Sequence, residues 1–378
     1  MSSLPADPAD LWRAKTRSFV AREVTPLASS IDREDRIPDA LLRRLAEERF
    51  LGLGIPPEWD GVGGSTCARA AVLEELSAGS AAVAVTVAVH LSVCAAPILT
   101  WGTERQKERF LRPLARGDGV GAFGLSEPEV GSDTARLATR YETTPEGFLL
   151  RGTKMFISNA VTAGVVLIFA TRDPGAGHRG ISAFIVPGGT RGFSVAQRLE
   201  KLGLRGSETT ELVLDGVRLP PDGLLGPEGG GLKVALGALA GGRVGIAACA
   251  LGVARAAFEE MQRNVVADDA EWKRAVLARS FVDLSAAAGL VRSAAERKDR
   301  GEPFVTEASS AKLAASRAAV SIAAAGVDVA GPPGARSGAV AERLFRDARV
   351  FPIVEGTTEI QELILGRTLV EPPASGNP

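Results

Sequence analysis

A single glutamate near the C-terminal end of the chain has surroundings that are unusual for a charged side chain. Glu355 follows the apolar run 351–354, and Gly356 comes directly after it. A carboxylate in an apolar pocket has a raised pKa and becomes a stronger base, which can remove a weakly acidic proton from carbon. The structural alternative is a glutamate that stabilises the N-terminus of a helix expected over 357–367.

The sequence offers few groups for other kinds of catalysis. The only histidines are His90 and His178, so a histidine-based triad or metal cage is nearly excluded. Cys67, Cys94 and Cys249 are scattered and have no CxxC spacing, so neither a disulfide framework nor a zinc site is expected. The sparse and odd cysteine count fits a reducing cytoplasm, and no metal is expected.

The overall charge gives no sign of nucleic-acid or membrane binding. The 378 residues carry 44 Lys+Arg against 45 Asp+Glu. One charge-free stretch, 76–103, is long enough to span a bilayer, but it is mostly Ala, Val, Ser and Thr and contains Pro97. We therefore expect a buried core helix there. The N-terminal MSSLPADPADLW contains acids and prolines and does not resemble a signal peptide.

The elements that must position Glu355 change in type along the chain. Up to about residue 120 the apolar spacing is helical, as in 39–54 and 104–118, with a glycine-rich loop at 57–65. Short β-branched runs bounded by Gly and Pro then predict a compact antiparallel β-domain with strands over 164–172, 180–187, 192–199 and 209–220.

After the glycine-rich 226–231, helical patterns return and continue to about residue 370. The alanine-rich runs 284–295 and 308–325 predict closely packed helices of a bundle, and often of a subunit interface. The fold class is α+β, with a helical domain over 1–119, a β-domain over 120–228, a four-helix bundle over 229–370 and a disordered tail over 371–378.

Five motifs in this order resemble the acyl-CoA dehydrogenase family over roughly residues 8–370. They are GAFGLSEPEVGSD (121–133), RGTKMFISNA (151–160), KLGLRGSETTELVLDGVRLP (201–220), LAGGRVGIAACALGVARAAFE (239–259) and RLFRDARVFPIVEGTTEIQELILGR (343–367). Several motifs in a fixed order are far more specific than any one glycine pattern.

The resemblance implies FAD-dependent α,β-desaturation of an acyl thioester in fatty acid or lipid metabolism. Glu355 would take the α-proton while the β-hydride passes to flavin N5, and its backbone N–H would help to polarise the thioester carbonyl. Gly356 would let the backbone approach the substrate. The resemblance also implies an electron-transfer flavoprotein as acceptor and a homo-oligomer, either dimer or tetramer.

Some members of the family carry the base at the position that matches Gly242, which has no carboxylate here. Within the family's two options the base is therefore Glu355. Arg243 matches an arginine beneath the base loop and is expected to orient that loop or to bind the thioester arm. The alternative is an ordinary surface arginine.

The resemblance also implies the flavin contacts. Phe123, Leu125 and Ser126 match positions that face the flavin ring, Phe156 an aromatic that packs on it, and Ser158 a hydroxyl near N5. Ser132 matches a serine between cofactor and thioester arm, and Thr357 and Glu359 match positions near the diphosphate. For Phe156 the alternative is the core of the β-domain. Arg205, Ser207 and Thr209 are expected to form a cluster at a strand edge, and a structural role and a ligand contact are equally expected for it. Lys154 and His178 are expected to face solvent.

Two regions depart from the family's ADP-binding signatures. Residues 261–278 have no Phe-Gly, and 327–338 place Asp328 and Pro332 where glutamine and glycine are expected. Proline removes an N–H that a diphosphate could use. The chain therefore pairs with another family member as a flavin-poor subunit of a hetero-oligomer, or binds FAD by a variant route, or no longer uses FAD.

A third departure concerns the substrate. Family members often carry an acidic residue near the pantetheine arm where Ala240 stands. Its absence leaves open a desaturase or oxidase of an acyl group on a carrier protein in secondary metabolism, beside the acyl-CoA substrate. The helix over 80–101 is expected to line part of the acyl pocket, with His90 or Trp101 shaping it.

Overall fold

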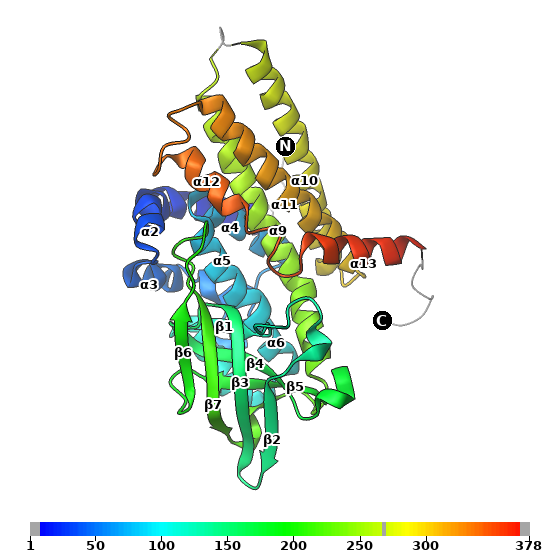
Figure 1. Cartoon of the computed structure of the whole chain (residues 1–378). Helices are drawn as coiled ribbons and strands as arrows, with labels where there is room; N and C mark the ends of the chain where they lie inside the picture. The colour runs from blue at the N-terminus through cyan, green and yellow to red at the C-terminus, as the bar shows by residue number, and fades with distance from the viewer. Residues whose placement is uncertain (1–7, 267–269, 371–378) are drawn as a thin grey trace, which may run out of the picture.

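The computed structural model describes residues 8–266 and 270–370. The expectations for the first residues and for the 371–378 tail lie outside this part of the chain, as do 267–269 within the first ADP-binding region. Figure 1 shows the β-domain below a group of long helices, with α2 and α3 of the N-terminal part at the left and α4, α5 and α6 in the middle. This is the three-part α+β architecture that the sequence predicts.

The N-terminal part is helical, as expected. The run 39–54, however, is helical only to Glu47, because Arg49 adopts a left-handed φ of 68° and a 3-10 turn follows. The α-helices of this part are α1 (Pro8–Phe19), α2 (Ala28–Glu34), α3 (Asp39–Glu47), α4 (Thr66–Gly79), α5 (Ala81–Val89), α6 (Ala96–Trp101), α7 (Glu104–Gln106) and α8 (Arg112–Arg116).

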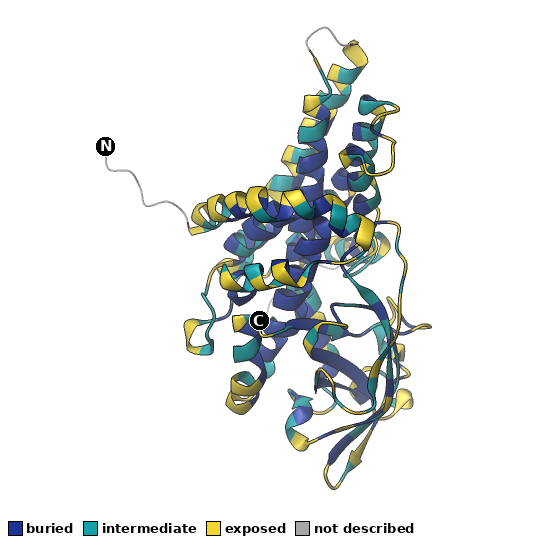
Figure 2. Ribbon diagram, turned by 90° about the vertical axis from the view of Figure 1, so that its left-hand side faces the viewer, coloured by how far each residue is buried: buried dark blue, intermediate teal, exposed yellow. Residues whose placement is uncertain are grey.

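The charge-free stretch forms a continuous helix, Ala81–Trp101, in which a π-helical segment joins α5 to α6. It is one of three described helices that are long and apolar enough to cross a membrane, but 83% of its apolar window is buried within the protein. The expectation of a buried core helix is confirmed. Figure 2 shows that buried residues, drawn in dark blue, fill the middle of the molecule.

His90 in this helix has a structural role. Its Nδ1 accepts a hydrogen bond from the N–H of Gly121 at 3.0 Å, and its Nε2 lies 2.9 Å from the carbonyl oxygen of Leu51. The acceptor role of Nδ1 places the proton on Nε2, so the neutral ring joins two backbone segments. Burial lowers the pKa of His90 to about 4, which keeps it neutral. Its polar atoms are thus engaged by backbone rather than by a ligand.

The middle part is a single eight-stranded sheet in the order β6-β7-β3-β2-β4-β5-β8, with β1 paired to β4. The four strands expected from the sequence are confirmed, but the sheet is mixed rather than antiparallel, because β1 and one residue pair of β2 run parallel to β4. The strands are β1 (Val120–Gly124), β2 (Arg140–Thr144), β3 (Gly147–Ser158), β4 (Ala163–Thr171), β5 (Ile181–Pro187), β6 (Phe193–Arg198), β7 (Thr209–Leu219) and β8 (Leu224–Leu225).

The C-terminal part consists of long helices around a central one. The central helix, α9, packs on α11, α10 and α12 and also on α4 and α5 of the N-terminal part. The alanine-rich runs lie in α10 and α11, where alanine allows close packing, and α13 extends from the body (Figure 1). The helices are α9 (Gly231–Arg263), α10 (Glu271–Asp299), α11 (Val305–Ala330), α12 (Val340–Ala348) and α13 (Thr358–Val370).

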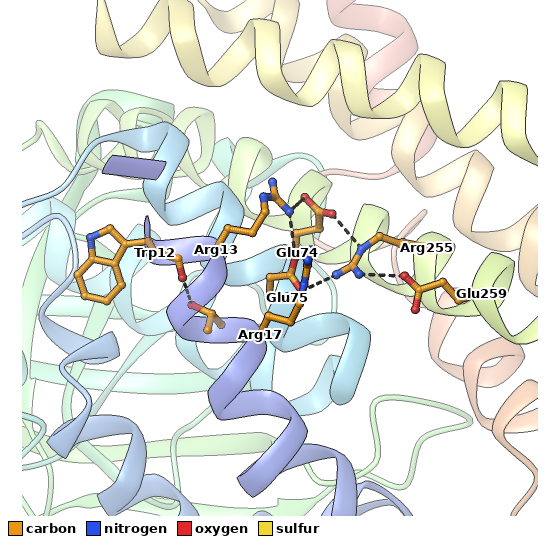
Figure 3. A network of polar contacts seen from close by, with 8 residues as sticks. Trp12, Arg13, Arg17, Glu74, Glu75, Arg255 and Glu259 are labelled. Carbon is orange, nitrogen blue, oxygen red and sulfur yellow. Dashed lines mark hydrogen bonds and ion pairs between the residues drawn. The ribbon is translucent and has the colours of Figure 1, made fainter. Parts of the chain in front are cut away.

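A network of charged side chains joins α1, α4 and α9 (Figure 3). Glu75, whose side chain is 3% exposed, accepts hydrogen bonds from Arg13 at 3.1 Å, Arg17 at 2.9 Å and Arg255 at 2.9 Å. Glu74 accepts from Arg13 and Arg255. The two carboxylates therefore bind arginines from two other helices and fix how α9 sits against the N-terminal part.

We expect Glu75→Gln to lower the free energy of unfolding by about 3 kcal/mol, because it leaves three arginines around an uncharged, buried side chain. Burial raises the pKa of Glu75, but the hydrogen bond from Arg17 and the charge of Arg255 outweigh it, and the net pKa is lowered. The stabilisation is therefore present at neutral pH and is lost as pH falls below the unfolded-state pKa.

Chemical denaturation at pH 7 measures the loss for Glu75→Gln. The matched control is Glu259→Gln, which removes the more exposed carboxylate bound to Arg255 on the same helix. This variant should change stability by less than about 0.5 kcal/mol. Equal effects of the two substitutions would show that the buried network does not fix the helices.

Candidate active site

The loop between α12 and α13 carries Glu355 in an unusual backbone conformation. Glu355 has φ 52° and Gly356 has φ 96°, so two successive residues are left-handed. Glycine adopts this region freely, whereas glutamate does so at some cost. Phe351 is fully buried and anchors the start of the loop in the helical core. The bend turns the Glu355 side chain inward, away from the start of α13.

The carboxylate of Glu355 is buried without a partner. The residue as a whole is half-buried, but both carboxylate oxygens are covered, and neither has a hydrogen-bond partner among the described residues. A cap would bond the backbone N–H groups at the start of α13, which begins at Thr358. The helix-cap alternative is therefore wrong, since the carboxylate makes no such bond.

Burial raises the pKa of Glu355 to about 7, while the positive charges of Arg243 and Lys312 oppose the rise. A carboxylate with this pKa is still ionised in part at neutral pH and is a far stronger base than an exposed glutamate. This is the environment that a base for a weakly acidic C–H bond requires.

Gly242 on α9 leaves the space that the carboxylate fills. A Cβ built on Gly242 would lie 2.1 Å from Oε2 of Glu355. The position that the resemblance implies as the alternative for the base thus directly adjoins Glu355. Only a residue without a side chain fits there while Glu355 points inward.

Arg243, the next residue on α9, is 7% exposed, and its Nε has no partner among the described side chains. It is therefore not an ordinary surface arginine, and that alternative is wrong. Burial lowers its pKa, and the charge of Glu355 opposes this shift. Its unpaired N–H is available to the Glu355 loop or to a ligand.

Sequence reasoning missed Lys312 and Gln361. Nζ of Lys312 donates to the carbonyl oxygen of Gly356 at 2.7 Å, and Nε2 of Gln361 donates to the same oxygen at 3.0 Å. Both side chains are fully buried. A lysine inside the alanine-rich run of α11 was the available signal, since such a run packs closely and a charge there needs a reason.

The expected flavin-facing residues of the β-domain are held through their backbone groups. The carbonyl oxygen of Ser126 accepts from the N–H of Met155 at 2.9 Å, and that of Leu125 accepts from Nζ of Lys154 at 3.1 Å. Lys154 also pairs with Glu127 at 2.7 Å. The segment that carries Leu125 and Ser126 is therefore fixed to strand β3.

The expectation that Lys154 faces solvent is wrong, because its exposed fraction is 0%. It follows Phe148 and Leu150 on the inward face of β3 at two-residue spacing, and Glu127 compensates its charge. The strand period was the signal that could have placed it. His178 is exposed, as expected.

Phe156 is 66% exposed, so it is not part of the β-domain core. A register shift between Lys154 and Ile157 and a φ of 62° at Phe156 turn its ring outward. Ser158, two residues on, is half-buried. The exposed face of this ring can pack against a flat ligand.

The remaining expected residues are placed as follows. Phe123 is half-buried, with its ring edge-to-face on Phe169 at 5.0 Å, and Ser132 lies on an exposed loop. Thr357 and Glu359 lie at the start of α13, where hydrogen bonding to the Thr357 side chain lowers the pKa of Glu359. Thr209 is half-buried and pairs with Ser158 across the sheet.

Two groups of the expected residues are thus assembled. Glu355, Gly356 and Arg243 meet around α9 and α11, whereas Leu125, Ser126 and Phe156 share one end of β3. Asp328 and Pro332, from the second ADP-binding region, are exposed at and just beyond the end of α11.

Comparison with known proteins identifies the chain's relatives. Family models of the acyl-CoA dehydrogenase N-terminal, middle and C-terminal domains match residues 7–118, 122–217 and 229–370. The short-chain specific acyl-CoA dehydrogenase of Bos taurus mitochondria is 38% identical over 369 residues, which cover 96% of this chain and 90% of the relative.

Solved structures agree over nearly the whole chain. Butyryl-CoA dehydrogenase from Megasphaera elsdenii has a TM-score of 0.94 and 33% identity, and the match covers 98% of this chain and 100% of that one. The prolyl acyl carrier protein oxidase AnaB has a TM-score of 0.92 and 26% identity, covering 97% and 100%.

Proposed function

Because the chain belongs to the acyl-CoA dehydrogenase family, we propose that it is an FAD-dependent dehydrogenase that introduces an α,β double bond into an acyl-CoA thioester. The family establishes the coarser statement: the protein is a flavoprotein oxidoreductase that acts on CH–CH bonds. The observation that carries the finer proposal is the buried carboxylate of Glu355, which has no hydrogen-bond partner among the described residues.

Glu355 is the base that takes the α-proton. Its raised pKa matches the weak acidity of a thioester α-carbon better than that of an exposed carboxylate. Backbone N–H groups of the left-handed bend at Glu355 and Gly356 would polarise the thioester carbonyl. Arg243 holds positive charge beneath the loop, and together with Ser132 and Gly356 it is proposed to bind the thioester arm.

Residues of the β-domain and of α13 would hold the cofactor. Phe156 offers an exposed aromatic face, Ser158 a hydroxyl beside it, and the segment through Leu125 and Ser126 backbone groups fixed by β3. These groups fit an isoalloxazine ring. FAD, when bound, supplies at N5 the acceptor for the β-hydride. Phe123, Thr357 and Glu359 complete the proposed flavin contacts.

The relatives support a choice of substrate. The names of the Bos taurus and Megasphaera elsdenii proteins indicate short acyl chains on coenzyme A. A carrier-protein thioester is the second candidate, favoured by Ala240 in place of an acidic residue and by the likeness to AnaB. Both substrates share the pantetheine thioester, so the same base serves either.

The proposed partners follow from the family. We propose an electron-transfer flavoprotein as the acceptor of the electrons and assembly into a tetramer, which is typical of the family. The three cysteines form no disulfide, which supports the proposal of a cytoplasmic enzyme.

The visible absorption spectrum of the protein purified alone is the first test. Flavin bands that bleach on anaerobic addition of butyryl-CoA support the proposal. Bands that bleach only with a butyryl carrier protein select the second candidate. A colourless protein that stays colourless with added FAD contradicts the proposal and favours a flavin-poor subunit.

A further inference from the structure

The carbonyl of Gly356 receives two hydrogen bonds from buried side chains of opposite character. Gln361 is a neutral donor at 3.0 Å, and Lys312 is a charged donor at 2.7 Å. Either would satisfy a backbone carbonyl, and a neutral donor would do so without the cost of burying a charge. The buried ammonium therefore needs an explanation beyond hydrogen bonding.

The other fully buried lysine, Lys154, has a carboxylate partner that Lys312 lacks among the described residues. Lys154 pairs with the carboxylate of Glu127 at 2.7 Å, so its charge is compensated by contact. Among the described residues, Lys312 has no carboxylate at ion-pair distance, and its hydrogen bond goes to an uncharged oxygen. Its charge is therefore compensated only through space, and the charges that favour its ionised form are Glu355 and Glu359.

We propose that Lys312 is a positioning residue of the site, which clamps the Gly356 carbonyl and keeps the adjacent Glu355 carboxylate ionised near neutral pH. The proposal rests on the role of Glu355 as the base. The hydrogen bond stabilises the left-handed pair Glu355–Gly356 from beneath, on α11. The charge opposes the desolvation of a carboxylate that has no hydrogen bond of its own among the described residues.

Other groups around Glu355 do not replace Lys312. From α9, Arg243 is the second cation, and the thiol of Cys249 has its pKa raised by burial and is neutral. From α13, Glu359 is an anion. Burial and Arg243 lower the pKa of Lys312 to about 8, so it is mostly charged at neutral pH, where its effect on Glu355 is needed.

The dependence of kcat/KM on pH separates charge from clamping. Lys312→Met removes the charge and one hydrogen bond, whereas Gln361→Met removes the other hydrogen bond to the same oxygen and no charge. We expect Lys312→Met to move the rise of kcat/KM to higher pH, so that activity at pH 7 falls about tenfold relative to activity at pH 9. Gln361→Met should lower activity evenly across pH.

A second readout needs no turnover. The change in stability caused by Glu355→Gln, measured by thermal unfolding from pH 5 to pH 9, reports where Glu355 ionises. In the Lys312→Met background, the effect of Glu355→Gln on stability should change at a higher pH than in the parent protein. An unshifted curve in both assays overturns the proposal. Absence of turnover in the parent protein would contradict the proposed function, while the unfolding experiment would still test Lys312.

Discussion

Glu355→Gln is expected to lower the rate of acyl-thioester dehydrogenation by about 10³- to 10⁴-fold, because it removes the proposed general base and leaves a side chain of the same shape. Flavin absorption and the overall fold should be unchanged. The amide also fits beside Gly242, since it occupies the space of the carboxylate. Steady-state turnover with a dye acceptor measures the loss. Activity within about tenfold of the parent protein would show that another group is the base.

If Glu355 is the base, as proposed, it is also expected to set the pH dependence of the parent enzyme. The base must be ionised, so kcat/KM should rise with pH through about 7, the pKa of buried Glu355. A rise near pH 4.5, or none at all, would contradict the assignment.

The contribution of Glu355 to the stability of the folded protein should fall as pH rises, whereas kcat/KM should rise. Burial raises the folded-state pKa of Glu355 above the unfolded value of 4.5. Its contribution to stability is therefore fully present below that unfolded value and is lost as pH rises through about 7. Glu355→Gln should accordingly stabilise the protein more at pH 8 than at pH 5, by at most about 3 kcal/mol. Unfolding at the two pH values measures the difference.

Gly242→Ala is expected to lower kcat/KM by about 10²-fold, because the added methyl group would displace the Glu355 carboxylate. The Cβ would lie 2.1 Å from Oε2, and a shift of about 1 Å in a catalytic group has an effect of this size. The obstructing atom ends a flexible side chain, so the fold should tolerate the change. Helix propensity should even stabilise the variant by about 1 kcal/mol.

The neighbouring glycine provides a matched control. A Cβ on Gly241 would meet Nζ of Lys298 at 2.7 Å, which is also the end of a flexible side chain but is no part of the site. Gly241→Ala should gain the same helix propensity and keep its activity within about threefold. Similar losses for the two variants would mean that rigidity of α9, and not space for Glu355, is what matters.

The spacing at Gly242 also explains why a transplanted base should fail. In Gly242→Glu combined with Glu355→Gln, the new side chain starts where the amide of residue 355 already lies. We therefore expect no recovery of activity in the double variant compared with Glu355→Gln. Restored turnover would show that the loop moves aside more easily than the structure indicates.

The sequence by itself determined the order of the domains and four of the eight strands, and it predicted Glu355 as the base. These features are local: β-branched runs between Gly and Pro specify strands, and an apolar run before Glu355 and Gly356 marks a carboxylate directed inward. The charge-free stretch was assigned correctly as a core helix, since its alanines and serines gain little from lipid.

Tertiary structure decided the environment of these residues. The burial of Lys154 depends on its carboxylate partner Glu127, and Lys312 reaches Gly356 from another helix. The pKa of Glu355 depends on three elements that meet only in the folded chain: its own loop, α9 and α11. A residue's electrostatic environment depends on neighbours that are distant in sequence, and no local pattern contains that information.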